Sequence, residues 1–119
     1  MVGYRSAYAN AMEIGTVLTA MADPTRRKIL EAVRRGPRSV GDIASDFDVT
    51  RPAVSQHLRV LADARLVRQH KSGRNHFYTL DMTGLTLLRD YLDDFWNDVL
   101  QSFQNAAIAE AAKKTGRPQ

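Results

Sequence analysis

The segment from Ser39 to Leu61 constrains the fold more than any other part of this chain, because its pattern predicts two short helices joined by a tight turn. Ser39 is a suitable N-cap for the first helix, the turn is Asp48 and Val49, and Thr50 caps the second helix. Apolar residues recur in both helices with a period near 3.6, at Val40, Ile43, Ala44 and Phe47 in the first and at Val54, Leu58 and Leu61 in the second. Both helices are therefore expected to bury one face in a common core.

The second helix of this pair carries polar and cationic side chains away from its apolar stripe, namely Arg51, Ser55, Gln56 and Arg59. Such side chains near the start of a helix are suited to contact base edges and phosphates in the major groove of DNA. The pattern therefore favours nucleic-acid recognition by the helix that follows Thr50.

Positive charge is concentrated in the same region of the chain. The formal net charge is +4, yet residues 51–80 contain six Lys or Arg and one Asp or Glu, a net charge of +5. Residues 1–50 carry +1 and residues 81–119 carry −2. A basic patch confined in this way is typical of a surface that binds a polyanion. The alternative is a solvated surface on which basic residues cluster by chance.

The N-terminal part of the chain predicts an arm and two helices. Residues 1–10 are expected to form a loose arm, and a first helix is expected over residues 12–21. Asp23 and Pro24 predict the start of a second helix, because Asp is a favoured N-cap and Pro a favoured first helical residue. That helix should end near Arg35, where Gly36 and Pro37 follow.

The C-terminal part predicts a hairpin and a long helix. Residues 66–71 and 75–80 read as strands joined by a turn at 72–74, in which Gly73 supplies the positive φ that a short turn needs. A last helix begins after residues 81–83 and ends near Ala112. We expect one domain over residues 1–112 and a flexible basic tail over 113–119.

Three segments of this chain resemble the winged helix-turn-helix repressors of the ArsR type. They are Asp-Pro-Thr-Arg-Arg-Lys-Ile-Leu at 23–30, Val-Ser-Gln-His-Leu-Arg-Val-Leu at 54–61, and the hairpin at 71–80. The resemblance covers roughly residues 13–100. It implies a mainly α fold with a small β-hairpin, a winged helix-turn-helix of about five helices plus a two-stranded wing. Asp48 and Arg65 depart from the pattern, since such proteins often have Gly there, at positions suited to a left-handed backbone.

The resemblance and the residues together predict a sequence-specific transcriptional regulator, a repressor that binds a pseudo-palindromic operator in double-stranded DNA. The helix from Thr50 to about Asp63 is expected to enter the major groove. The expected DNA-binding residues are Arg51, Ser55, Gln56 and His57 at the bases, Arg38, Ser39, Thr50 and Arg59 at phosphates, and Lys71, Arg74 and Asn75 on the wing tip, which would reach the flanking backbone or minor groove. Pro52, in the first turn of the same helix, is also expected at the DNA surface.

The last predicted helix has a wide apolar stripe for so small a protein, and a stripe of this kind needs a partner surface. We expect it to form a homodimer interface through Leu88, Leu92, Phe95, Trp96, Val99 and Phe103. The resemblance implies the same, because such repressors pack their first and last helices across a two-fold axis. The alternatives are a lid over the protein's own core, or a pocket for an apolar effector lined by Tyr91, Phe95, Trp96 and Phe103.

Metal and cofactor chemistry find little support. The chain has no Cys, which excludes disulfides, thiolate metal sites and cysteine nucleophiles. His70 and His76 are expected on opposite strands of the hairpin and could approach one another, but two His make a poor zinc site. Asp90, Asp94 and Asp98 read as a solvated helix face. Metal-sensing members of the resembled family use Cys, or His with acidic residues on the last helix. We therefore expect no metal, no cofactor and no metal response.

Other function classes are also disfavoured. Ser55 and His57 are two residues apart on a helix and do not face one another, and the glycines are scattered singly, so no catalytic pair or phosphate loop is indicated. We therefore expect that the protein is not an enzyme. The chain has no run of 18 apolar residues and no signal-peptide pattern, so we expect a cytoplasmic protein. Two alternatives remain: a winged-helix protein-interaction module without DNA binding, and a small-molecule-responsive repressor with its effector at the last-helix interface.

Overall fold

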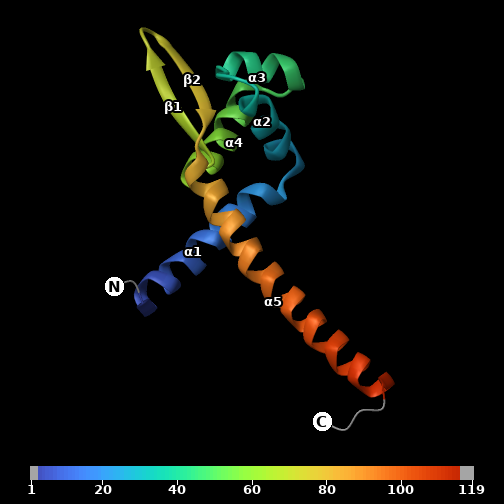
Figure 1. Cartoon of the computed structure of the whole chain (residues 1–119). Coiled ribbons are helices and arrows are strands. Elements are labelled where there is room, and N and C mark those ends of the chain that lie inside the picture. Colours follow the sequence, from blue (N-terminus) through green and yellow to red (C-terminus); the bar gives the residue numbers. More distant parts are fainter. Residues whose placement is uncertain (1–2, 116–119) are drawn as a thin grey trace. The chain divides into compact units, whose positions relative to one another are not determined.

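The computed structural model describes the backbone of residues 3–115 and the side chains of residues 13–114 (Figure 1). Its elements are α1 (Gly3–Ala22), α2 (Pro24–Arg34), α3 (Val40–Phe47), α4 (Arg51–Asp63), β1 (Val67–Ser72), β2 (Asn75–Leu80) and α5 (Met82–Thr115). The predicted fold class is confirmed, since the described residues form five helices and one antiparallel hairpin. The contacts divide the chain into two compact units, one up to Leu88 and one from Arg89 onward.

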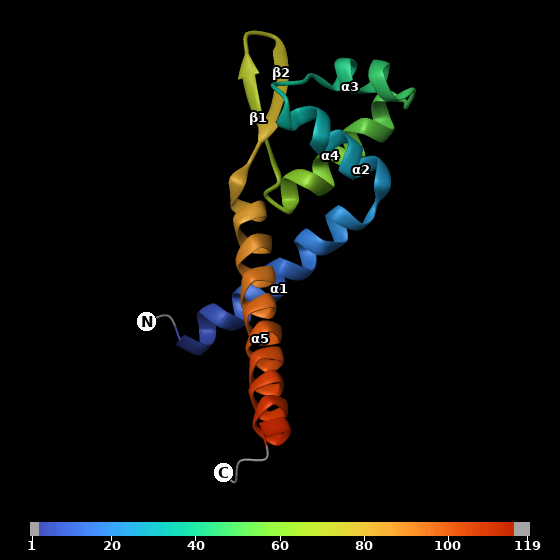
Figure 2. The ribbon, with the colours of Figure 1, turned by 45° about the vertical axis from the view of Figure 1, so that its right-hand side comes forward.

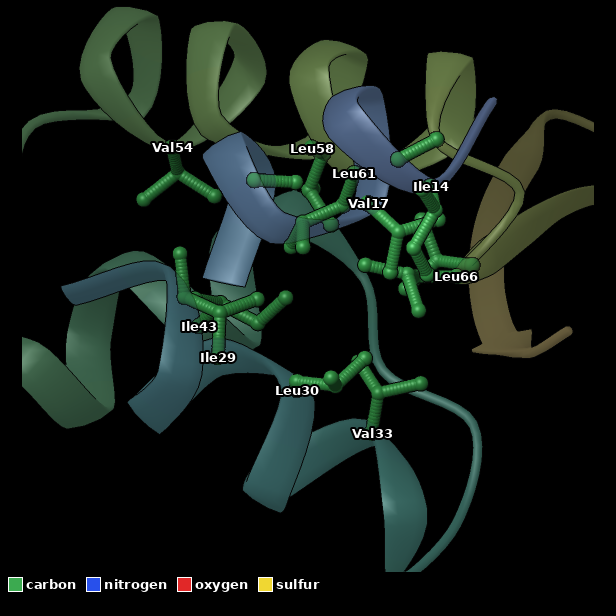
Figure 3. Close-up of a cluster of buried hydrophobic side chains, with 13 residues drawn as sticks. Ile14, Val17, Ile29, Leu30, Val33, Ile43, Val54, Leu58, Leu61 and Leu66 are labelled. Atoms are coloured by element: carbon green, nitrogen blue, oxygen red, sulfur yellow. The ribbon is translucent and has the colours of Figure 1, made fainter. Parts of the chain in front are cut away.

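The core of the first unit contains side chains from α1 to α4 and β1 (Figure 3). Val54, Leu58 and Leu61, the predicted stripe of α4, are completely buried and point into the cluster that includes Ile29 and Ile43. Burying a branched side chain of this kind contributes about 1.5–3 kcal/mol relative to leaving it exposed. Since the stripe anchors α4 to the core, the opposite face of this helix remains available for a ligand.

The helix-turn-helix boundaries follow from hydrogen bonds between side chains and backbone. Ser39 Oγ accepts from the N–H of Asp42 at 3.1 Å, and a carboxylate oxygen of Asp42 accepts from the N–H of Ser39 at 3.3 Å, which is a capping box. Thr50 Oγ1 accepts from the N–H of Ala53 at 3.3 Å and caps α4. Asp48 ends α3 in the left-handed region, with φ 53° and ψ 46°. The predicted caps and turn are therefore confirmed.

The residues of the Asp-Pro-Thr-Arg-Arg segment form the start of α2 and connect it to α1. Asp23 Oδ1 accepts from the N–H groups of Thr25 and Arg26 at 2.7 and 3.1 Å, confirming the predicted N-cap. The guanidinium groups of Arg26 and Arg27 donate to carbonyl groups at the end of α1, at 2.8 Å to Ala20 and 2.7 Å to Met21. The last carbonyl groups of a helix accept no hydrogen bond from its own N–H groups. The two arginines satisfy these carbonyls and thereby join α1 to α2.

The hairpin differs slightly from its predicted form. Ser72 pairs with Asn75, so β1 is shifted by one residue to Val67–Ser72 and the turn contains only Gly73 and Arg74. Gly73 has φ 64°, as the short turn requires. An additional bridge joins Arg38 to Tyr78, with N–H to O=C distances of 3.1 and 2.7 Å. This bridge, which the sequence pattern did not predict, connects the segment before α3 to the hairpin.

The two ends of the described chain are more helical than predicted. α1 begins at Gly3, so the loose arm expected over residues 1–10 is wrong for residues 3–10, where alanines favour a helix; residues 1–2 lie outside the described part. α5 continues to Thr115, beyond the expected end near Ala112. Lys113 and Lys114 thereby occupy its last turn, where cations interact favourably with the helix dipole. Residues 116–119, the remainder of the predicted tail, lie outside the described part. Within it, no helix is long and apolar enough to cross a membrane.

Candidate nucleic-acid interface

One open groove brings together predicted DNA-binding residues from three separate elements. It is lined by Ser39 at the start of α3, by Arg51 and Ser55 on α4, and by Arg74 and Asn75 at the hairpin tip. The hairpin projects beside α3 and α4 in both views of the fold (Figure 1, Figure 2). The groove therefore lies between the starts of α3 and α4 and the tip of the hairpin, although Ser55 and Arg74 are about twenty residues apart in sequence.

The remaining exposed members of the predicted set lie on or next to the same elements but do not line this groove. Gln56 and Arg59 lie on α4 away from its buried stripe, and both are exposed. Other exposed residues of the set are Thr50 and Pro52 at the start of α4 and Lys71 on β1. Because the buried apolar stripe fixes the orientation of α4 about its axis, the polar side chains of this helix are exposed together on its other side.

Two predicted residues are placed differently from the others. His57 is half-buried on the flank of α4. The hydrogen bond from the N–H of Arg26 is the main cause of the lowered pKa of Asp23; desolvation opposes it, and His57 makes the smallest contribution. Arg38 is also half-buried, and its Nε is a buried donor without a hydrogen-bond partner among the described residues. His57 and Arg38 do not line the groove.

Several groove residues were not predicted from the sequence. They are Val40, Gly41, Gln69, His76 and Tyr78. Gln69 Nε2 lies 2.9 Å from His76 Nδ1 and donates to the Tyr78 hydroxyl at 3.2 Å, which connects the two strands across one face of the hairpin. The alternation of side chains along the two strands could have identified three of these residues, because Gln69, His76 and Tyr78 lie on the same face of the hairpin as the buried Val67.

The strand register corrects one expectation about histidines. His70 pairs with Phe77, whereas His76 pairs with Lys71, so the two imidazoles lie on opposite faces of the hairpin and do not approach one another. His70 Nε2 is instead 2.7 Å from Thr79 Oγ1. Among the residues that the structure describes, no group of three or more His, Asp or Glu is placed to hold a metal ion.

The electrostatic balance of the groove is positive. Arg51 and Arg74 both line it, and no Asp or Glu is among its lining residues. The ion pairs described in the chain use other arginines, such as Arg26 with Asp23 and Arg68 with Asp81. A concave surface lined by cations and small polar groups concentrates the field on an approaching anion.

The predicted dimer residues form an exposed apolar face on α5. Phe95 and Trp96 are each 60% exposed and Phe103 is 69% exposed, while Leu92 is also exposed and Val99 is half-buried. Leu88, at the end of the first unit, is half-buried against the core. Large exposed aromatic side chains in such a row are uncommon on a protein surface without a partner.

Comparison with known proteins agrees with this architecture. Residues 23–69 match the family described as "Bacterial regulatory protein, arsR family". The HTH-type transcriptional regulator Rv2034 of Mycobacterium tuberculosis (strain ATCC 25618 / H37Rv) is 51% identical over 91 residues, covering 76% of this chain and 85% of that protein. The transcriptional repressor SdpR of Bacillus subtilis (strain 168) is 36% identical over 84 residues, covering 71% and 93%.

A solved structure extends the agreement to most of the chain. The ArsR-like transcriptional regulator from Rhodococcus sp. RHA1 superposes with a TM-score of 0.75 at 28% identity, covering 93% of this chain and 97% of that one. The relatives are transcriptional regulators and not enzymes, as the sequence predicted. The resemblance noted in the sequence is thus confirmed: the chain belongs to the ArsR family of bacterial transcriptional regulators.

Proposed function

We propose that this regulator is a cytoplasmic homodimeric repressor that binds a pseudo-palindromic operator and does not respond to metal ions. The observation that carries the DNA-binding part is the groove in which Ser39, Arg51 and Ser55 meet Arg74 and Asn75. A ligand that contacts all of these residues must span a helix and a wing and must accept hydrogen bonds from cations. Duplex DNA, with base edges in its major groove and phosphates on either side, meets both requirements.

Within this proposal the DNA-binding residues divide by what they contact. Gln56 lies on the solvent face of α4, where its amide can pair with the N6 and N7 positions of adenine. Arg74 lies at the tip of the hairpin and reaches the flanking backbone. Ser39 and Thr50 add hydroxyl groups at helix starts, where phosphate oxygens are favoured by the helix dipole.

The dimeric part of the proposal rests on α5. Its exposed Phe95, Trp96 and Phe103 supply an apolar surface that a second copy can cover, and closed two-fold dimers are the commonest soluble oligomers. A two-fold axis would place two copies of α4 in successive major grooves, with half-sites about 34 Å apart or a multiple of that distance. Residues 1–112 would then contain both the DNA-binding and the dimerisation surfaces.

The test is selection of duplexes from random or genomic fragments by the purified protein, followed by affinity measurements on the selected duplex and a scrambled one. We expect affinity to fall roughly a thousandfold between about 50 and about 200 mM salt if a dimer neutralises about six phosphates. Selection of no preferred duplex, together with affinity that does not depend on salt, would contradict the proposal and favour a protein-interaction module.

Two substitutions separate base contacts from phosphate contacts in the same assay. Gln56→Ala should cost about 1–3 kcal/mol on the selected duplex and change the base preferred at one position of each half-site. Arg74→Ala, the matched control, should weaken the selected and scrambled duplexes by the same factor, because phosphates carry no sequence information. Equal losses on both duplexes for Gln56→Ala would show that α4 does not contact a base through this residue.

A further inference from the structure

The first turn of α3 and the first residue of α4 are in unusually close contact. A Cβ atom built on Gly41 would lie 3.0 Å from Nη2 and 3.4 Å from Cζ of Arg51. The guanidinium of Arg51 therefore lies next to Gly41, so close that a side chain at position 41 would require it to shift. Both residues line the candidate DNA-binding groove.

The contact leaves the hydrogen-bonding capacity of Arg51 unused. Within the described part of the chain, no ion pair or side-chain hydrogen bond involves Arg51. Its side chain is exposed at the start of α4, and the neighbouring groove residues Ser55 and Asn75 are neutral. The guanidinium is thus restricted on one side by Gly41, while its N–H donors remain free to bind a ligand.

We infer that Gly41 is a positioning residue for Arg51, and that it sets the guanidinium in the orientation that recognises guanine in the major groove. This inference rests on the proposed function. Arg donates to O6 and N7 of guanine through two parallel hydrogen bonds, so recognition depends on the angle and height of the guanidinium plane. A methyl group at position 41 would require the guanidinium to move by a few tenths of an ångström.

The helical location of Gly41 makes this inference testable without unfolding the protein. Alanine has a higher helix propensity than glycine, so Gly41→Ala should leave thermal stability unchanged or raise it. The atoms that the new methyl group meets belong to the far end of a flexible side chain, which can move away. A loss of DNA affinity without a loss of stability would therefore report on Arg51.

The experiment measures the affinities of Gly41→Ala, Arg51→Ala and the double variant for the selected duplex, for a scrambled duplex, and for selected duplexes altered at each guanine. Ser45→Ala is the matched control, because Ser45 is exposed on the same helix as Gly41 and does not line the groove. We expect Gly41→Ala to weaken the selected duplex roughly tenfold. Discrimination should be lost at the same guanine that Arg51→Ala ceases to recognise, and the double variant should be no weaker than Arg51→Ala.

Each outcome separates this inference from the proposed function. Equal costs of Gly41→Ala in the wild-type and Arg51→Ala backgrounds would overturn the positioning role, as would wild-type affinity of Gly41→Ala. Unchanged base preference in Arg51→Ala would also overturn it, while leaving the proposed function standing. If the wild-type protein prefers no duplex, the proposed function fails and the inference fails with it.

Discussion

Replacing Gly84 with alanine should destabilise the first unit, because the start of α5 packs against the backbone that follows α4. A Cβ on Gly84 would lie 2.5 Å from the carbonyl oxygen of Ala64 and 2.8 Å from that of Arg65. Both atoms are backbone, so no side-chain rotation can relieve the clash. The N–H of Gly84 also donates to the carbonyl of Arg65 at 2.7 Å, which holds the two segments together.

The expected loss of stability is the sum of two destabilising effects and one stabilising effect. Overpacking of a tight contact costs about 1–3 kcal/mol. Weakening of the hydrogen bond between Gly84 and Arg65 adds about 1 kcal/mol. The higher helix propensity of alanine offsets about 1 kcal/mol. The net change should be a decrease of about 1–3 kcal/mol in the free energy of unfolding, a substantial part of the stability of a small domain.

Denaturant unfolding monitored by circular dichroism measures this change, with the protomer concentration held constant because dimerisation contributes to apparent stability. Ser45→Ala is again the control, since Ser45 is exposed on α3 and alanine has the higher helix propensity, so this variant should be neutral or stabilising. If Gly84→Ala unfolds at the same denaturant concentration as Ser45→Ala or at a higher one, the packing argument is wrong.

Three further predictions concern metal response, assembly and pH. Titrating Zn²⁺, Ni²⁺ or Cd²⁺ at micromolar concentration should leave DNA affinity unchanged, and a stoichiometric loss of affinity reversed by a chelator would contradict this. Val99→Asp should convert a sedimenting dimer to a monomer, because it places an unpaired charge in an apolar interface, and a wild-type monomer at tens of micromolar would refute the dimer. The N–H of Thr83 lowers the pKa of Asp81, aided by Arg68 and opposed by desolvation. Asp81 should therefore stabilise the fold above its ordinary pKa of 3.8, and this contribution should be lost as pH falls through the lower pKa of the folded state. The free energy of unfolding should consequently depend less on pH in Asp81→Asn than in the wild-type protein, when both are measured at about pH 3–5.

The features predicted best depend on interactions between neighbours in sequence. Ser39, Thr50 and Asp23 were identified as N-caps because each contacts N–H groups only two or three residues away. Local hydrogen-bonding rules apply to these caps whatever the rest of the chain does. Asp48 and Arg65 were identified as left-handed positions through the family resemblance instead, and their φ values are 53° and 58°.

The errors arose where local signals were weak or where distant segments meet. Residues 3–10 mix the helix formers Ala and Arg with weak ones such as Gly, Ser and Asn, so the local signal for the helix there was weak. The bridge between Arg38 and Tyr78 joins residues forty positions apart, which no short pattern reports. His70 and His76 were separated by the strand register, because a shift of one residue reverses the face of every side chain.

The sequence by itself determined the helix-turn-helix, its caps, the location of the basic segment and the family, because these depend on periodicity, short-range hydrogen bonds and composition. Only the tertiary structure decided which of the polar residues share a groove. The hairpin register places Gln69 and His76 in the same groove as Arg51, the packing of α4 leaves His57 half-buried outside that groove, and Gly41 borders the guanidinium of Arg51. These contacts depend on how the buried faces of separate elements pack, and packing depends on all of those elements at once.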